Sequence, residues 1–486
     1  MIIKGKIFSG DEFIENLKIV GGKIVGLNVS EESDLDFGER TVLPAFIDAH
    51  AHFTDMGFRS FWLNAFNLKR KKDFLDLIAR AAQVTPKGDW ILIAGFDETR
   101  WTDDPTYPTR KELDEVAPDH LVYARRICGH MAVINSRVIR FFNIQKGRNI
   151  DIERGILREE AMKQIESYLK SNIEKLAQGI LKAQEMCLKE GVIAISEFLS
   201  PRTLMALRLL SEERLMVNLC LYFYYEYAKM LIDLGFWKGW KFNGVILNGI
   251  KIFLDGSIGA RTAAFYDAYK DDPRNKGQLL IDESNLLEII KLAERAKMQL
   301  AIHAIGDRAI DVALNALKNI SKGNPLRHRI EHFEAATDDQ IKTAAKLNII
   351  LSMQPNFLQW QIPGGMYERR LGKERAKMLN RFRTIINSGA IAAFGSDSMP
   401  FGPMYGVYWA VNHPNENEKI NLIDAVRCYT YNSAYALFLE KRLGKIARGF
   451  EAKIIVLDRD IFSEDFSKLK ESKVIAFISG EKIINL

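Results

Sequence analysis

Cysteine is scarce in this sequence of 486 residues, which has only four, far apart and without paired spacing: Cys128, Cys187, Cys220 and Cys428. A disulfide framework and a thiolate zinc site both need cysteines at short, repeated spacings, so the sequence predicts neither. Reduced cysteines fit a cytosolic protein, and we expect a cytoplasmic location. Glutamine is also rare, with 11 residues, which points towards a thermophilic source.

Long apolar runs and a strong excess of one charge are absent too. The first residues, MIIKGKIFSG, lack the apolar segment and small-residue cleavage site of a signal peptide, and no run is long enough to cross a membrane. Net charge is +6, from 68 basic and 62 acidic residues. The short basic run LKRKKDF (68–74) fits a solvated helix start better than a nucleic-acid patch. We therefore expect a small-molecule substrate, neither nucleic acid nor membrane as a partner, and possible homo-oligomers.

Short apolar runs alternate with amphipathic stretches through the middle of the chain. The amphipathic stretches, such as ESNLLEIIKLAERAKM, repeat at helical spacing. This alternation predicts a (β/α)8 TIM-type barrel. Its eight strands are expected at AFIDAH (45–50), VIAISEFL (192–199), MVNLCLYFY (216–224), GIKIFLDG (249–256), QLAIHAIGD (299–307), RHRIEHFE (327–334), NIILSMQP (348–355) and AIAAFGSD (390–397).

The two chain ends differ from this middle because both read as short strands. We expect residues 1–45 and 440–486 to form one small β-sandwich domain, and residues 46–439 to form the barrel. Between the first and second barrel strands lie about 140 residues, too many for one crossover. The sequence therefore predicts a large insertion after strand 1, a lid subdomain of about residues 55–185 over the barrel mouth.

The stretch VLPAFIDAHAHFTD (42–55) ends a predicted core strand in two histidines. Because an extended chain has a period of two, His50 and His52 point to the same side of the strand. Two imidazoles converging at a strand end suit a divalent metal, although the tripeptide alone fits two hydrogen-bonded rim histidines equally well.

The other strand ends favour the metal. Of eight histidines in the chain, four lie at the C-terminal ends of predicted barrel strands, where such barrels carry their catalytic groups. His50 and His52 end the first strand, His303 the fifth and His332 the sixth, while the eighth runs into Asp397. A shared metal site explains this grouping better than four separate structural roles.

The fourth strand, GIKIFLDG, places a lysine in the barrel. Ile250, Ile252 and Leu254 are expected to face the helices, which turns Lys251 into the lumen. A buried ammonium is costly unless it is paired, so Lys251 is expected to lose its proton or to be modified. A neutral amine can take up carbon dioxide and become a carbamate that bridges two metals. The alternative is a lysine paired with Asp255 or Asp397.

This ligand set resembles the amidohydrolase superfamily. Longer segments are similar to the branch that contains N-substituted formamide deformylases: KIFLDGSIGARTA (251–263), AIHAIGDRAID (301–311), RIEHFE (329–334), FGSDSMP (394–400) and RICGHMAVINS (126–136). The tail GKIARGFEAKIIVLD resembles the last β-sandwich strands of that family, and the match covers nearly the whole chain. In two places the sequence departs from it: Cys128 replaces an acid before Gly-His, and Lys453 replaces an acid in the sandwich.

The resemblance implies a binuclear centre. His50, His52 and Asp397 would hold one divalent ion, His303 and His332 a second, and N-carboxylated Lys251 would bridge them; zinc suits this set, although manganese, iron and cobalt also fit. Asp397 would orient the attacking water and carry its proton to the leaving amine.

Further residues near the expected mouth have open roles. His130 is placed to polarise the carbonyl or bind a substrate oxygen, or it is a lid histidine paired to the backbone. Arg261 could bind a substrate carboxylate or pair with Asp255. Asp307 and Arg308 are candidates to support His303, and Glu197 stays unassigned. The aromatic run LYFYYEY (221–227) and Trp360 are expected to shape an apolar pocket.

The leading interpretation is a metal-dependent hydrolase that cleaves an amide or related C–N bond, in an N-acyl, N-formyl or cyclic amide. The alternatives are a mononuclear deaminase, an ester or lactone hydrolase on the same scaffold, and a non-catalytic regulatory protein.

Overall fold

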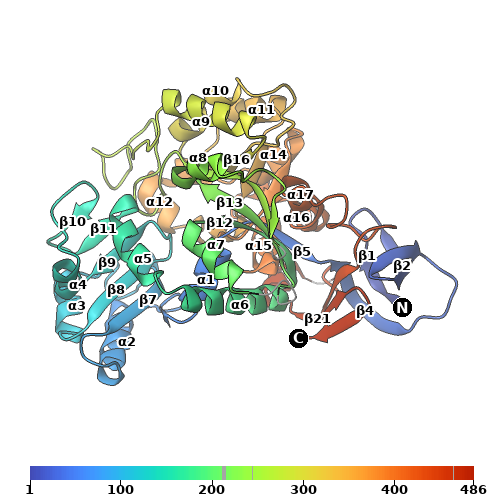
Figure 1. Ribbon diagram of the computed structural model, residues 1–486, viewed down its shortest axis with the longest axis horizontal. Helices are drawn as coiled ribbons and strands as arrows, with labels where there is room; N and C mark the ends of the chain where they lie inside the picture. The colour runs from blue at the N-terminus through green and yellow to red at the C-terminus, as the bar shows by residue number, and fades with distance from the viewer. Residues whose placement is uncertain (211–214, 243–244, 464) are drawn as a thin grey trace.

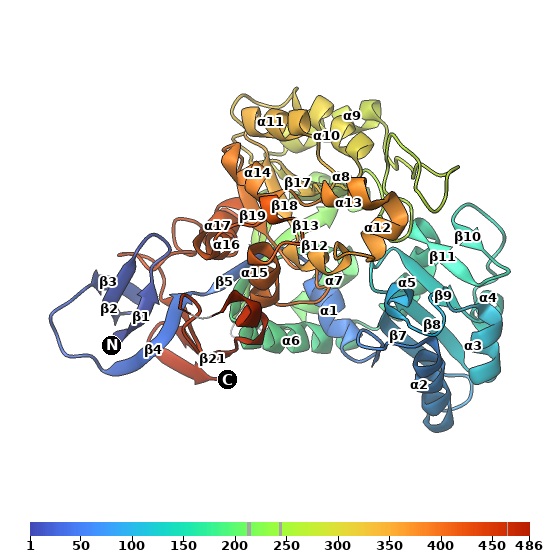
Figure 2. The same cartoon turned by 180° about the vertical axis from the view of Figure 1, so that it is seen from behind.

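The computed structural model describes residues 1–210, 215–242, 245–463 and 465–486, and the described strands form three sheets. Figure 1 shows the barrel in the middle, the sheet of the insertion on the left and the sheet of the two chain ends on the right. Figure 2 shows the same arrangement from behind. Every described helix is too short or too polar to cross a membrane.

Eight parallel strands form the barrel, and they confirm the predicted fold class. The strands are, in sheet order, β5 (Phe46–Ala51), β12 (Val192–Leu199), β13 (Asn218–Tyr224), β15 (Val245–Phe253), β16 (Gln299–Ala304), β17 (Arg329–His332), β18 (Ile350–Met353) and β19 (Ala392–Phe394), with the short β14 (Lys241–Phe242) beside β15. All residues of β12, β16 and β18 are buried. Strands covered on both faces read as continuous apolar runs, which is the pattern that identified them in the sequence.

Asp48 joins the last strand to the first, β19 to β5, between which the described residues form no ladder. Its carboxylate accepts hydrogen bonds from the backbone nitrogen of Ser396 at 3.1 Å and from Ser396 Oγ at 2.6 Å. The Asp397 nitrogen donates to the His50 carbonyl oxygen at 2.8 Å. A Cβ atom at Gly395 would lie 2.4 Å from the His50 nitrogen, so only glycine allows this approach. The barrel seam thus lies beside two of the predicted metal ligands.

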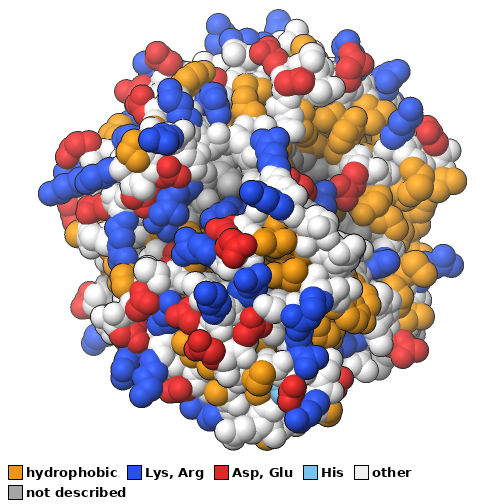
Figure 3. Space-filling view, turned by 90° about the vertical axis from the view of Figure 1, so that its left-hand side faces the viewer, with side chains coloured by type: hydrophobic (Ala, Val, Ile, Leu, Met, Phe, Trp, Pro, Cys, Tyr) orange, Lys and Arg blue, Asp and Glu red, His pale blue; other side chains and the backbone are white. Residues whose placement is uncertain are grey.

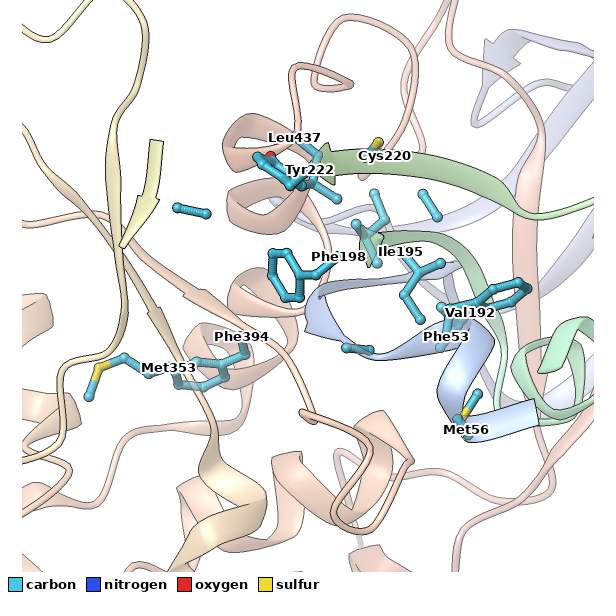
Figure 4. Close-up of a cluster of buried hydrophobic side chains, with 14 of the residues drawn as sticks. Phe53, Met56, Val192, Ile195, Phe198, Cys220, Tyr222, Met353, Phe394 and Leu437 are labelled. Carbon is cyan, nitrogen blue, oxygen red and sulfur yellow. The ribbon is translucent and has the colours of Figure 1, made fainter. Parts of the chain in front are cut away.

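Helices cover the outside of the barrel, and α6 packs against α1 and α7. The helices of this layer and the loops above it are α1 (Phe53–Arg59), α6 (Ile173–Lys189), α7 (Pro201–Arg208), α8 (Tyr225–Asp233), α9 (Glu283–Arg295), α10 (Asp307–Leu317), α11 (Asp338–Lys346), α12 (Met366–Leu371), α13 (Lys373–Lys377), α14 (Phe382–Asn387), α15 (Pro403–Val411), α16 (Leu422–Cys428) and α17 (Tyr431–Ala436), with the 3-10 turns η4 (Pro355–Trp360) and η5 (Glu416–Glu418). Figure 4 shows the buried core between these layers, with Phe198 between β12 and the strands that carry Met353 and Phe394.

The insertion forms a sheet of its own, in the strand order β10, β11, β9, β8, β7, β6. Its elements are β6 (Leu63–Asn64), α2 (Lys71–Val84), β7 (Trp90–Phe96), η1 (Glu98–Arg100), α3 (Arg110–Val116), β8 (Leu121–Arg126), β9 (Met131–Ile134), α4 (Ser136–Phe141), β10 (Ile150–Asp151) and β11 (Ile156–Arg158), followed by η2 (Glu159–Met162) and α5 (Lys163–Leu169). The basic run at residues 68–74 leads into α2, with Lys69, Arg70 and Lys72 exposed as expected for a solvated helix start. Lys71 instead is buried and paired with Asp104 and Glu112. Acidic and basic side chains are interspersed on the face that the insertion presents (Figure 3). The predicted insertion reaches residue 185, whereas α6 lies in the helix layer of the barrel.

The two chain ends share one seven-stranded sheet with its own apolar core. Its order is β22 (Lys482–Asn485), β21 (Val474–Ser479), β20 (Lys453–Leu457), β4 (Leu35–Pro44), β1 (Ile2–Phe8), β2 (Phe13–Val20) and β3 (Lys23–Leu27), with η6 (Phe466–Glu471) before β21. The sheet folds over on itself, so that its edge strand β3 meets the segment before β20. There the Ile24 nitrogen donates to the Phe450 carbonyl oxygen at 3.0 Å. Lys453, one of the departures from the family, donates to Ser479 Oγ at 2.6 Å, far from the barrel mouth.

Candidate metal centre

The residues expected to hold metal come together at one end of the barrel. His50 and Lys251 lie in β5 and β15, His303 lies in β16, and His332 ends β17. His52 directly follows β5, and Asp397 lies three residues after the last residue of β19. Asp397 and His332 both have a positive φ, of 51° and 72°, a conformation that non-glycine residues seldom adopt and that often marks functional positions.

His50, His52 and Asp397 form the tightest group. Their nearest ligand atoms all lie within 4.8 Å of one another. Asp397 Oδ1 is 3.1 Å from His52 Nε2 and 3.5 Å from His50 Nε2. Burial raises the pKa of Asp397, but the two imidazoles outweigh it and hold the pKa well below its usual value. The carboxyl group is therefore ionised, as a metal ligand must be.

His303 and His332 lie next to this group. Their ring centroids are 4.4 Å apart, and the His332 ring lies 4.7 Å from that of His50. Burial lowers the pKa of both rings well below the usual value. Because neutral imidazole is the form that binds metals, both side chains are ready to act as ligands.

Lys251 extends into the barrel interior, as the alternation of β15 predicted. It is 1% exposed, and its Nζ lies 4.3 Å and 4.9 Å from the ring centres of Phe198 and Phe253. Among the described residues Nζ has no hydrogen-bond partner, so the alternative pairing with Asp255 or Asp397 is not formed. Burial lowers the pKa of Lys251 to about 8, against the raising effect of Glu331 and Asp397.

The residues present fit a metal centre. In the described part of the chain, four buried side-chain atoms of this cluster lack a hydrogen-bond partner: His50 Nε2, Lys251 Nζ, His332 Nδ1 and Asp397 Oδ1. Buried polar atoms nearly always have partners, and leaving several unpaired at one place is costly. Imidazole nitrogens and a carboxylate are the donors that zinc and related divalent ions prefer.

Glu331 and Arg329 support the cluster from below, and the sequence did not identify them. Glu331 Oε2 is 2.5 Å from His50 Nδ1, which leaves Nε2 to face Asp397. Arg329 Nε lies 2.6 Å from Glu331 Oε1, and both residues are fully buried. Burial raises the pKa of Glu331, but Arg329 and His50 outweigh it and bring the pKa to about 2. An ionised carboxylate thus orients His50, as partners of metal-bound histidines do.

The support of His303 differs from the prediction. His303 Nε2 is 3.0 Å from the Gly256 carbonyl oxygen and 3.5 Å from Asp255 Oδ1. Asp307 instead accepts from the backbone nitrogens of Tyr266 and Arg308 at the start of α10. The expected role of Asp307 and Arg308 was therefore wrong, because the chain turns into α10 before either side chain can reach His303.

Glu197 lies in β12 beside Ala51 of β5, and its Oε2 has no hydrogen-bond partner among the described residues. Its Oε1 accepts from the Thr54 nitrogen at 3.2 Å, in the first turn of α1. Carboxylates satisfy the free N–H groups at a helix N-terminus, and this helix begins directly after His52. Glu197 therefore positions the chain that carries one ligand.

His130 reaches the cluster from the insertion. Its ring centroid lies 5.5 Å from that of His303, and its Nδ1 is 2.9 Å from Glu159 Oε2. Thr262 Oγ1 donates to the other oxygen of Glu159 at 2.6 Å. Burial lowers the pKa of His130, but Glu159 outweighs it and raises the pKa to about 9. The partner is thus a carboxylate, and not the backbone, so His130 is held as a hydrogen-bond donor beside the metal ligands.

Arg261 does not line the cavity beside this centre. Its guanidinium binds Asp271 through two parallel hydrogen bonds, Nε to Oδ1 at 3.0 Å and Nη2 to Oδ2 at 2.8 Å. Asp255, the partner considered from the sequence, accepts from the backbone nitrogens of Ala264 and Gly306 instead. The binding of a substrate carboxylate by Arg261 stays a prediction, and the structure gives the side chain a partner already.

One cavity joins the barrel ligands to the insertion. It is lined by His303, His332 and Asp397, by Cys128 and His130 of the insertion, and by loop residues above the barrel: Ser257, Ile258, Gly259, Ile305, Glu334, Phe357, Trp360, Met366, Tyr367 and Met399. Trp360 lines it as expected, whereas no residue of the aromatic run 221–227 does. Cys128, where the sequence departs from the family pattern, is part of the cavity wall. A substrate in this cavity would contact both the ligand cluster and the insertion.

The fold and the site define a hydrolase barrel, and the comparison with known families agrees. The amidohydrolase family matches residues 35–484, so the chain belongs to this family. N-substituted formamide deformylase of Arthrobacter pascens is 24% identical, with 96% of this chain and 92% of that protein aligned. Protein LONG AFTER FAR-RED 3 of Arabidopsis thaliana is 26% identical, with 99% and 91% aligned.

A solved structure with the same architecture has also been described. The crystal structure of an uncharacterized metal-dependent hydrolase from Pyrococcus horikoshii OT3 is 29% identical, with a TM-score of 0.79 over 96% of this chain and 98% of that one. The barrel, the insertion and the terminal sheet of the present chain are thus shared, as a whole, with a protein described as metal-dependent.

Proposed function

We propose that this protein is a metal-dependent hydrolase that cleaves an amide or a related C–N bond. The observation that carries the proposal is the group of four buried atoms without hydrogen-bond partners among the described residues, on His50, Lys251, His332 and Asp397. Membership of the amidohydrolase family and the likeness to N-substituted formamide deformylase support the choice of bond.

Two divalent ions fit this donor set, and zinc suits its imidazoles best. His50, His52 and Asp397 would hold one ion, His303 and His332 the other, and Lys251 would bridge them as an N-carboxylated side chain. When bound, such ions polarise a substrate carbonyl group and make water more acidic.

The chain's own residues supply proton transfer and orientation. Asp397, which faces both His50 and His52, accepts a proton from the attacking water and passes it to the leaving amine. His130 donates a hydrogen bond to the oxygen of the carbonyl group, and Glu159 fixes the ring for this role. Phe357, Trp360 and the other apolar residues of the cavity wall exclude bulk water.

A panel of substrates tests the proposal. The full-length protein, supplemented with zinc, manganese or cobalt, is assayed with N-acyl amines, N-formyl amines and cyclic amides, and in parallel with esters, lactones and amino-substituted heterocycles. Bound metal is counted by elemental analysis. We expect hydrolysis of amides with two ions per chain. Release of ammonia by a protein with a single bound ion would favour a mononuclear deaminase. Turnover of esters alone would favour an esterase, and no turnover of any substrate would favour a regulatory protein.

A further inference from the structure

Asp55 joins the turn that carries a metal ligand to the insertion. It lies in the first turn of α1, three residues after His52. Its Oδ2 accepts from Arg125 Nη1 of β8 at 2.5 Å. The same oxygen is 2.9 Å from Arg59 Nε, and Oδ1 is 2.7 Å from the Nζ of Lys170, the residue after α5. Because charge-assisted contacts of this kind are strong, the turn after His52 and the insertion are held together here.

Arg125 in turn holds the backbone that leads into His130. Its Nε and Nη2 both donate to the Gly129 carbonyl oxygen, at 3.4 Å and 3.3 Å, and Nε lies 3.3 Å from Glu166 Oε1. Gly129 has a φ of 75°, and a Cβ atom there would lie 3.1 Å from Arg125 Nη2. Glycine suits both this conformation and this close approach. The Gly129 carbonyl group belongs to the planar peptide unit that enters His130, so holding its oxygen fixes the direction of the chain at that residue.

His130 is therefore held from two sides. Glu159 Oε2 holds the ring, 2.9 Å from Nδ1, and Arg125 holds the backbone before it. The result is a ring whose centroid lies 5.5 Å from that of His303. A displacement of about 1 Å in a group that acts on the reacting atoms can remove much of its effect. Neither Asp55 nor Arg125 lines the cavity, so neither is placed to touch a substrate in it.

We propose that Asp55 and Arg125 are positioning residues, which set the place of His130 relative to the metal ligands. The inference rests on the proposed function, in which His130 donates to the carbonyl oxygen of the substrate. Asp55 fixes the insertion against the turn that follows His52, and Arg125 passes this constraint on to the peptide unit before His130. The role needs a guanidinium, because its planar fork reaches a carboxylate and a carbonyl oxygen at once, whereas the ammonium of lysine is a point charge.

Arg125→Lys tests the fork, because it keeps the charge and removes the two-sided contact. In the zinc-supplemented full-length protein, we expect kcat for an N-acyl amine to fall about tenfold, with KM and metal content nearly unchanged. Asp55→Asn, which weakens the same link from its other end, should lower kcat about threefold or more. Arg137→Lys makes the same exchange in α4 of the insertion, where the side chain pairs with Asp119, and this control should keep full activity.

The His130→Ala background separates positioning from a general effect on the fold. If Arg125 acts through His130, Arg125→Lys should change kcat less than about twofold once the imidazole is gone. An equal fall in kcat in both backgrounds would overturn the proposal, because the loss would then not depend on His130. If Arg125→Lys does not fold, Asp55→Asn in the two backgrounds decides the question by the same criterion.

A measurement without turnover separates this inference from the proposed function. In NMR spectra of the protein labelled with 15N-histidine, the His130 signals are assigned by their loss in His130→Ala. We expect Arg125→Lys and Asp55→Asn to shift these signals and Arg137→Lys to leave them in place. Signals that stay unmoved in both Arg125→Lys and Asp55→Asn would overturn the positioning role, even if the protein hydrolyses amides. Signals that move, without hydrolysis of any amide, would support the role and count against the proposed reaction.

Discussion

The two walls of the cavity treat buried polar groups in different ways. On the barrel wall, His50, Lys251 and Asp397 each keep a buried atom without a hydrogen-bond partner among the described residues. On the wall built by the insertion, His130 is paired with Glu159, and Arg261, which lies outside the cavity, is paired with Asp271. Unpaired buried donors indicate where something absent from the chain binds, whereas paired groups hold the fold.

The barrel itself contains both kinds of group. Directly below the ligands, Arg329 and Glu331 form a pair that is fully buried. Glu331 links this ion pair to the ligands, because its Oε2 lies 2.5 Å from His50 Nδ1. Variants of the ligands are therefore expected to act on activity, and variants of the ion pair on stability.

Asp397→Asn is expected to have the largest effect on activity. The change keeps the size of the side chain but removes the charge that faces His50 and His52, along with the proton acceptor. We predict a fall in kcat of about 1000-fold or more, together with lower metal content in elemental analysis. Asp339→Asn, at a side chain that is 93% exposed, is the control. Full activity in Asp397→Asn would show that the unpaired donors are not the catalytic centre.

Glu331→Gln is expected to act on stability. Arg329 would remain buried beside a neutral amide, and breaking a buried pair in this way costs about 3–5 kcal/mol in the free energy of unfolding. Denaturant titration measures the loss. Adding Arg329→Met should recover part of it, because the double variant leaves no unpaired charge. A single variant as stable as the wild type would mean that this pair does not hold the barrel floor.

Lys251→Ala tests whether the unpaired amine is a ligand. We expect activity to fall by at least roughly 10- to 100-fold, which is the usual cost of losing a group that supports a metal site. Added acetate or propionate should restore part of the activity, because its carboxylate can replace the carbamate. Labelled bicarbonate should give a carbamate carbon signal in the NMR spectrum of the wild type only. Lys291→Ala, at an exposed lysine in α9, controls for the change of charge. Unaltered activity and no such signal would leave Lys251 with a purely structural role.

Glu159→Gln should have a smaller effect, because it weakens the orientation of His130 and leaves the metal ligands intact. A fall in kcat of about tenfold is expected, with KM and metal content nearly unchanged. Glu160→Gln alters the adjacent, exposed residue, which bonds Asn149, and should have no effect. A change in KM alone would mean that His130 binds substrate without acting on the reaction.

Arg261→Ala is expected to have the smallest effect. The residue pairs with Asp271 at the edge of the cavity region, where partly exposed pairs contribute about 0–1 kcal/mol. We predict less than about a twofold change in kcat/KM and in stability. A large rise in KM confined to carboxylate-bearing substrates would instead support the substrate contact that the sequence suggested.

Periodicity made most of the barrel and its ligands predictable. All eight strands lie where apolar runs indicated, and the alternation of β15 placed Lys251 inside. The grouping of His303, His332 and Asp397 was predictable because parallel strands in a barrel bring their C-terminal ends to one face. Both predictions combine local sequence patterns with one rule of barrel topology, and for this reason they could be made from the sequence.

The supporting contacts were not predictable in the same way. Glu331 has no local feature that distinguishes it from other acids in strands, and its partner His50 is 281 residues away. Glu159 meets His130 only because the chain returns through β11, and its contact with Thr262 joins the insertion to the barrel. Arg261 pairs with Asp271 rather than with Asp255, because the loop folds back within ten residues. Such contacts depend on how loops close, which periodicity does not encode.

Anomalous diffraction from crystals grown with zinc would show directly whether these residues hold two ions. We expect two metal peaks, one among His50, His52 and Asp397 and one beside His303 and His332, with additional density on Lys251 Nζ between them. No peak at His50 and His52, or a single peak with an unmodified lysine amine, would contradict the binuclear hydrolase proposed for this chain.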